Sequence, residues 1–212
     1  CGDALTTGVQ NVAVGLSALG AMTAGDKNVA IGNSALSVAN VTDGSETFNV
    51  AVGYAAGGAV TTGIQNTLIG GLAGDALTDA DYNVAVGLNA LSTDTLGSRN
   101  TAVGTNALAT QNFTTATDAY NVAVGTNAGI SVTTGTFNTL IGGLAGDALT
   151  TGSTNVALGV QALTTEDTGQ GAVAIGYQAL YSQNYDGVSY NVAVGRNAGE
   201  SITTGTNNTL IG

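Results

Sequence analysis

A five-residue pattern, Asn-Val-Ala-Val-Gly with close variants, is written twelve times along this chain of 212 residues. Each copy reads Asn, then Val or Thr, then Ala or Leu, then Val, Ile or Leu, then Gly, and only one copy lacks the Asn. The copies begin at Asn11, Asn28, Asn49, Asn66, Asn83, Asn100, Asn121, Asn138, Asn155, Ala172, Asn191 and Asn208. Self-similarity at a fixed period is typical of stacked repeat architectures, so this pattern constrains the fold more than any single residue does.

The start numbers of most successive copies differ by 17 (28 − 11, 66 − 49, 83 − 66), and this interval defines one coil. The intervals after the second, sixth and tenth copies are 21 (49 − 28), 21 (121 − 100) and 19 (191 − 172). The array therefore also repeats every four coils, at spacings of 72 (121 − 49) and 70 (191 − 121). The extra residues fall in the segments 37–48, 109–120 and 181–190. We predict one continuous array over residues 1–212, built by duplication of a four-coil block and cut from a longer fibre.

The pentapeptide predicts a β-strand, because Val-Ala-Val alternates large and small side chains at period two and Gly ends it. We expect the branched residues Val12, Val14, Val29 and Ile31 to form the core with Leu19 and Leu36. The Ala row would then face outward and let another backbone come close. A second apolar stretch, as in 148–152, predicts a second short strand in each coil. The expected fold class is all-β, a parallel β-solenoid or β-roll.

Composition excludes several classes of function. The chain has 33 Gly and no Pro, a net charge of −11, and only Lys27, Arg99 and Arg196 as cations, so nucleic-acid binding is not expected. His is absent and Cys1 is the only Cys, so we predict no enzyme, no cofactor and no metal site. No apolar run is long enough to insert into a membrane. Cys1 aligns with Ala73 inside a coil, and a lipidated N-terminus is the alternative.

Association of chains is also expected. Each coil offers few apolar side chains for burial relative to the number of residues that folding must order. Stacking of coils adds burial, and contact between chains would add more.

The repeats resemble the head repeats of trimeric autotransporter adhesins (the YadA-like head), as in Asn28-Val29-Ala30-Ile31-Gly32 and Val173-Ala174-Ile175-Gly176. The run 176–182 is similar to repeats of phage tail fibres. The resemblance covers essentially the whole chain. It implies a left-handed β-roll, a homotrimer, an extracellular location on a cell surface or virion tail, and an attachment role. The adhesin repeat is shorter than the interval found here, so the resemblance does not define the trimer geometry or a ligand surface. The two kinds of fibre stay open, as does the choice between attachment and a rigid spacer. An ice- or calcium-binding surface solenoid is the alternative function.

Two sets of side chains are candidates for recognition. The residue that directly precedes the pentapeptide is aromatic in five coils: Phe48, Tyr82, Tyr120, Phe137 and Tyr190. We expect these rings to cap the core at a corner of the coil, and the alternative is an exposed contact row. The second set is a recognition edge made by the longer coils, since insertions in a solenoid map to one face. Phe113, Tyr181, Tyr185 and Tyr190 would contact a glycan or protein on a host surface. The Asn row is expected to be a structural ladder rather than a ligand-facing surface.

Overall fold

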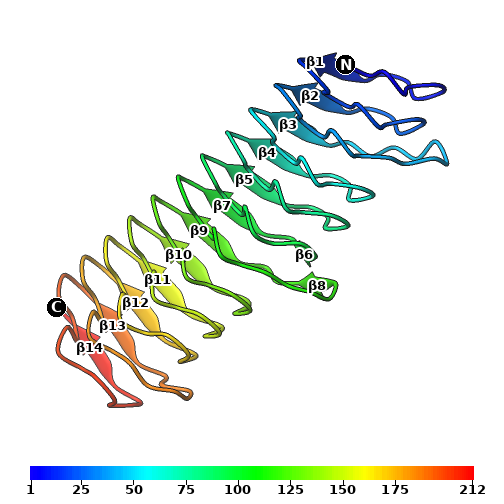
Figure 1. Ribbon diagram of the computed structural model, residues 1–212. Coiled ribbons are helices and arrows are strands. Elements are labelled where there is room, and N and C mark those ends of the chain that lie inside the picture. The colour runs from blue at the N-terminus through cyan, green and yellow to red at the C-terminus, as the bar shows by residue number, and fades with distance from the viewer. The chain divides into compact units, whose positions relative to one another are not determined.

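The computed structural model describes residues 1–212 and contains strands but no helix. The chain forms two compact units, Cys1–Asn100 with Asn112–Asp118, and Thr101–Gln111 with Ala119–Gly212. In each unit, successive coils stack so that their strands follow one another like rungs (Figure 1).

The first unit contains five stacked three-residue strands, in the order β1 (Val12–Val14), β2 (Val29–Ile31), β3 (Val50–Val52), β4 (Thr67–Ile69) and β5 (Val84–Val86). It also holds the two-residue pair β6 (Gly97–Ser98) and β8 (Thr117–Asp118). The second unit stacks seven strands: β7 (Thr101–Val103), β9 (Val122–Val124), β10 (Thr139–Ile141), β11 (Val156–Leu158), β12 (Val173–Ile175), β13 (Val192–Val194) and β14 (Thr209–Ile211).

Pairing within each unit is parallel and joins equivalent residues of adjacent coils, for example Ala123 with Leu140 and Leu140 with Ala157. The parallel β-solenoid, with one coil for each copy of the pentapeptide, is therefore confirmed. The second strand predicted for each coil is wrong. Turns and bends occupy that side of the coil, apart from the β6–β8 pair and two isolated bridges, Asp26 with Glu46 and Gln170 with Val188. Tight turns take the place of extended pairing because each coil contains several left-handed backbone positions.

The strand faces are the reverse of those predicted. The central Ala or Leu of the strands is the side chain that points inward, and it is fully buried in all strands from β3 to β13 that have three residues. The flanking side chains point outward: Val12 is 47% exposed and Val14 56% exposed in the first coil, and those of most later coils are partly exposed. Leu19 and Leu36 are buried as expected. The coil is thin, and the Leu that follows the first corner already fills its interior, which leaves room for only a methyl group on the strand.

Some strands carry Leu rather than Ala at their centre, and these strands show how the core is filled. Where the corner Leu is replaced by Gly, the centre of a strand carries Leu instead, as at Leu140. A Cβ atom built at Gly129 would lie 2.6 Å from one terminal methyl of Leu140, and one built at Gly146 would lie 2.7 Å from the other. One strand Leu therefore fills the space left by two glycines in adjacent coils. Leu68 does the same for Gly57 and Gly74.

The Gly that ends each pentapeptide is required by the backbone. The φ angle of this Gly lies between +125° and +144° in the coils from Gly15 to Gly159, and it has similar values in the other complete coils. L-residues avoid this region of φ. A Cβ at Gly125 would come within 2.5 Å of the carbonyl oxygen of Gly142 in the next coil. These glycines allow the coils to stack in contact at this corner.

The Asn row is a structural ladder, which confirms the prediction. The side-chain oxygen of Asn138 accepts a hydrogen bond from the backbone N–H of Asn155 at 3.0 Å. Its Nδ2 donates to the carbonyl oxygen of Gly152 at 2.9 Å. Equivalent bonds recur from coil to coil at Asn49, Asn66, Asn83, Asn121 and Asn155, all of them buried. Each Asn thus satisfies backbone groups that the narrow coil would otherwise bury without partners.

Candidate functional site

The outer surface of the stacked strands is the largest candidate interface in each unit. We number each coil from its Asn as position 1 and define the outer strand face as the side chains at positions 2, 4 and 6. Positions 2 and 4 are Val, Ile, Leu or Thr in every coil. Position 6 adds exposed Leu16, Tyr54, Leu88, Val160 and Tyr177.

Charge is almost absent from this face. The chain has 14 acidic residues, and none of them occupies position 2, 4 or 6 of any coil. Arg196 is the only cation there, and its guanidinium carbon lies 5.4 Å from the centre of the Tyr177 ring. A partly exposed apolar surface of this kind, continued over successive strands without acidic side chains, is typical of the core of a protein–protein interface.

The aromatic residues at the last position of the coil lie along the border of the outer strand face. Phe48, Tyr82, Tyr120, Phe137 and Tyr190 are all exposed, so the prediction that they cap the core is wrong, and the alternative of an exposed row holds. The reason lies in the alternation: the buried Asn at position 1 points inward, and the residue before it therefore points outward. All five have φ between +50° and +59°, which places them at a left-handed corner.

These rings contact their neighbours along the row. The rings of Tyr120 and Phe137 are stacked with their centres 5.8 Å apart and an angle of 12° between their planes. In the first unit, Lys27 lies over Phe48 at 5.0 Å and Arg99 lies over Tyr82 at 4.6 Å. Lys27 also pairs with Glu46, and Arg99 with Asp118 at 3.0 Å. The row is therefore an ordered border in which positive charge is already neutralised.

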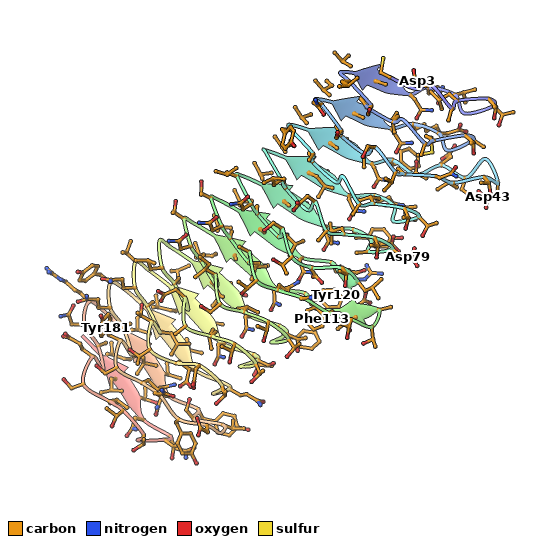
Figure 2. All side chains as sticks on the ribbon, viewed as in Figure 1. Asp3, Asp43, Asp79, Phe113, Tyr120 and Tyr181 are labelled. Atoms are coloured by element: carbon orange, nitrogen blue, oxygen red, sulfur yellow. The ribbon has the colours of Figure 1, made fainter.

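The opposite ends of the coils are polar. Asp43 and Asp79 lie at the ends of their coils farthest from the strands (Figure 2). Threonines on this side donate their hydroxyl groups to carbonyl oxygens of the next coil, for example Thr61 to Thr78 and Thr133 to Thr150, both at 3.1 Å. These hydroxyls stabilise the stack.

The predicted recognition edge is divided by the structure. Phe113 is only 7% exposed, packed against the segment around Asp94, so it is not available for recognition. Tyr181 is half-buried in the turn that follows β12 (Figure 2). Tyr185 and Tyr190, 37% and 62% exposed, lie on the surface of the third longer coil. The prediction of an edge formed by all four side chains is therefore wrong. Tyr185 and Tyr190 remain candidates for recognition because they are exposed.

Buried carboxylates lie beneath the second and third of the longer coils, and sequence reasoning missed their role. Asp94 is fully buried and accepts hydrogen bonds from the backbone N–H groups of Gly97 at 3.0 Å and Phe113 at 2.9 Å. Glu166, at the equivalent position of the next four-coil block, is also fully buried and accepts from Gly169 at 2.8 Å. Burial raises the pKa of Glu166, although N–H donors around it favour the charged form. The sequence contains a signal for these buried carboxylates: the same coil position is apolar in most other coils.

Two further carboxyl groups are incompletely hydrogen-bonded. One oxygen of Asp75 and one of Asp147 are buried without a hydrogen-bond partner, and burial raises the pKa of both side chains. They occupy the same position in the fourth and eighth coils. The structure contains no group of three or more His, Cys, Asp and Glu side chains that could hold a metal ion, and neither unit contains a pocket.

A scan against protein-family models, a search of curated proteins and a search of solved structures each found no significant match for this chain. No helix in the structure has the length and apolar character needed to cross a membrane.

Proposed function

We propose that this chain is a segment of an extracellular homotrimeric fibre, either a cell-surface adhesin or a phage tail fibre, that carries an attachment surface. The observation that carries the proposal is the outer strand face, which is largely apolar, at least partly exposed in every coil and free of acidic residues in a chain of net charge −11. A free monomer would leave this face in water along every coil. Contact with identical chains would bury it.

The composition of the face favours a second and third copy over an unrelated partner. Identical chains present matching rows of Val and Ile side chains at the same spacing of about 4.8 Å, the distance between hydrogen-bonded strands. Three copies around one axis each bury the same face, as closed cyclic symmetry requires. The exposed rings at the last position would then form the rim of each contact. A left-handed β-roll is part of the same proposal, by resemblance to the YadA-like head.

The alternative of an ice-binding surface has less support. Such a surface needs free hydroxyl groups in regular rows, and the Thr hydroxyls at the coil ends are used in bonds such as Thr61 to Thr78. The outer strand face has Thr at position 2 in only four coils: Thr67, Thr101, Thr139 and Thr209. A calcium-binding role has no acidic cluster to support it.

Attachment is tested with cells and loop variants. Fluorescently labelled protein is added to cultured epithelial cells and to a panel of bacterial cells, and bound fluorescence is measured. We expect binding to one of the two kinds of cell: epithelial cells for an adhesin, bacteria for a tail fibre. A variant in which segments 37–48, 109–120 and 181–190 are shortened to the length found in the other coils should fold and bind less. Equal binding by this variant would mean that the segment is a spacer.

A further inference from the structure

The third longer coil presents several exposed side chains. Tyr185, Val188 and Tyr190 are exposed at 37%, 42% and 62%. Their positions are set by glycines. A Cβ at Gly187 would lie 2.9 Å from the Tyr185 ring, and one at Gly171 would lie 3.3 Å from both the Tyr190 ring and the Val188 side chain. Each ring therefore lies against backbone that has no side chain, which leaves the other side of the ring to solvent.

Glu166 holds this coil from below. Its carboxylate oxygens accept hydrogen bonds from the backbone N–H of Tyr185 at 3.3 and 3.4 Å and from the side-chain amide of Gln183 at 2.9 Å. The same amide nitrogen of Gln183 lies 3.2 Å from the hydroxyl of Ser189, and the Gln183 side-chain oxygen accepts from Asn191 at 2.8 Å. Glu166, Gln183, Ser189 and Asn191 are all fully buried. The network fixes both ends of the exposed segment 184–190.

The fold itself does not need this network. In the first block of coils, the positions equivalent to Glu166 and Gln183 hold Met22 and Ala39, both buried in an apolar core. Burial of a carboxylate costs free energy even when it is hydrogen-bonded. The pair recurs in the second block as buried Asp94 and Gln111, so an acid with a Gln accompanies the second and third longer coils. In the second block the residue whose N–H the acid binds, Phe113, is buried, and in the third the equivalent residue, Tyr185, is exposed. A buried polar network that orients a surface group is typical of a preorganised binding site.

The chemistry of the segment selects one class of ligand. Residues 166–191 contain no Lys or Arg and include Asp167 and Asp186, so an anionic ligand would be repelled. The exposed Asn184 side chain makes no hydrogen bond within the chain. Asp186 is exposed and uses one oxygen to accept from Thr168 at 3.0 Å. Ring faces beside amide and carboxylate groups match a neutral sugar, which has an apolar C–H face and hydroxyl groups at its edge.

We propose that Tyr185, Val188 and Tyr190, with Asn184 and Asp186, bind a neutral hexose of a glycan, and that Glu166 is a positioning residue for this platform. The sugar ring lies against the tyrosines, and its hydroxyls donate to Asp186 and exchange hydrogen bonds with Asn184. Neither unit contains a pocket, so a single platform binds weakly, and repetition on three chains raises the strength of attachment. This inference rests on the proposed attachment function and names its ligand class.

Saturation-transfer NMR on the 212-residue chain tests the platform, with the methyl glycosides of glucose, galactose, mannose and N-acetylglucosamine as separate probes. We expect transfer to ring protons of at least one probe. Binding should fall at least tenfold in Tyr185→Ala and in Tyr190→Ala. It should be unchanged in Tyr82→Ala, an exposed ring at the last position of a coil in the first unit. The proposal is overturned if none of the four probes shows transfer, or if transfer in Tyr185→Ala and Tyr190→Ala equals that in the parent protein.

The positioning role has its own variant, Glu166→Met with Gln183→Ala, which copies the apolar pair of the first block. This double variant should keep the circular dichroism spectrum of the parent at the temperature of the binding assay, and should bind the same sugar at least fivefold more weakly. Its thermal midpoint should fall, because the N–H groups of Gly169 and Tyr185 and the side-chain amide of Asn191 lose their partners. Unchanged binding removes Glu166 from the proposal. The cell assay separates the two proposals: attachment to cells without sugar binding indicates a protein receptor and overturns only the sugar platform. Sugar binding without attachment overturns the fibre's proposed function.

Discussion

The pairing of one strand Leu with two corner glycines makes a quantitative prediction about Leu140. Leu140→Ala removes a fully buried side chain whose two terminal methyl groups fill the spaces beside Gly129 and Gly146. The two glycines on the wall of the resulting cavity have no side chain to move inward, and the neighbouring Leu108 and Leu149 side chains are themselves fully buried. We therefore expect a loss near the upper part of the range for buried Leu→Ala changes, about 4 kcal/mol.

A second change should repair the first. Gly146 has φ +56°, and so does Leu163 at the equivalent corner of the next coil. The backbone at Gly146 therefore already has the conformation that a Leu adopts at this corner. Gly146→Leu alone places a Cβ 2.7 Å from a Leu140 methyl and should cost about 2 kcal/mol through overpacking. Combined with Leu140→Ala, it recreates the arrangement of Ala157 with Leu163, apart from the contact of the new Cβ with Leu149 at 2.9 Å. The double variant should then lose much less than about 6 kcal/mol, the sum of the two single losses of about 4 and about 2.

The assay is urea unfolding of the four proteins, followed by circular dichroism at the β-sheet minimum. Non-additivity in the free energy of unfolding is the measured quantity, because contacting residues couple and independent residues do not. If one Leu substitutes for the corner side chain, Leu140→Ala is less stable than the double variant. If the losses of the two single variants add in the double variant, one Leu does not substitute for the corner side chain, and the description of the core is wrong.

Further predictions concern the corner, the ladder and a buried acid. Gly125→Ala should prevent stable folding because its Cβ meets the Gly142 carbonyl, whereas Gly143→Ala, with no atom closer than 3.9 Å, should unfold at nearly the parent temperature. Asn138→Ala should lower the free energy of unfolding by about 2 kcal/mol, measured in urea, since it leaves the N–H of Asn155 and a carbonyl oxygen without partners. Asp147→Ser should raise the thermal midpoint at pH 7 and have little effect at pH 3 in scanning calorimetry. Burial raises the pKa of this carboxyl, so the folded state binds the proton more tightly than the unfolded chain, and stability falls as pH rises through the raised value. An equal effect of Asp147→Ser at both pH values would contradict this explanation.

The sequence was sufficient to predict the period, the parallel stacking and the Asn ladder, because each depends on a residue type that recurs at one position. It did not lead to the correct inward face. The expectation that Val12 and Val14 are buried followed the usual rule for a half-buried strand, and that rule fails when the opposite wall of the coil fills the interior. The relevant signal was present: Leu140 and Leu68 replace Ala at the strand centre in coils whose corner residue is Gly. Only the contacts of these side chains show that the two substitutions are coupled.

The candidate sites divide in the same way. Exposure of Tyr190 follows from alternation with the buried Asn191, and could have been derived once the inward face was known. The burial of Phe113 could not, because the N–H groups of Phe113 and Tyr185 make the same bond to an acid of the preceding coil, and only the Phe113 side chain is buried. The third longer coil is shorter than the second, and its equivalent residue, Tyr185, is exposed. Such differences depend on how each longer segment folds over its own coil.

The central claim, that the outer strand face joins identical chains, is tested most directly by sedimentation equilibrium at micromolar concentration. One chain has a mass of 20.6 kDa, so the account predicts a single species of three times that mass. The variant Val124→Asp, which places a carboxylate on that face, should shift the mass towards one chain. A folded parent protein that sediments at 20.6 kDa would contradict the account.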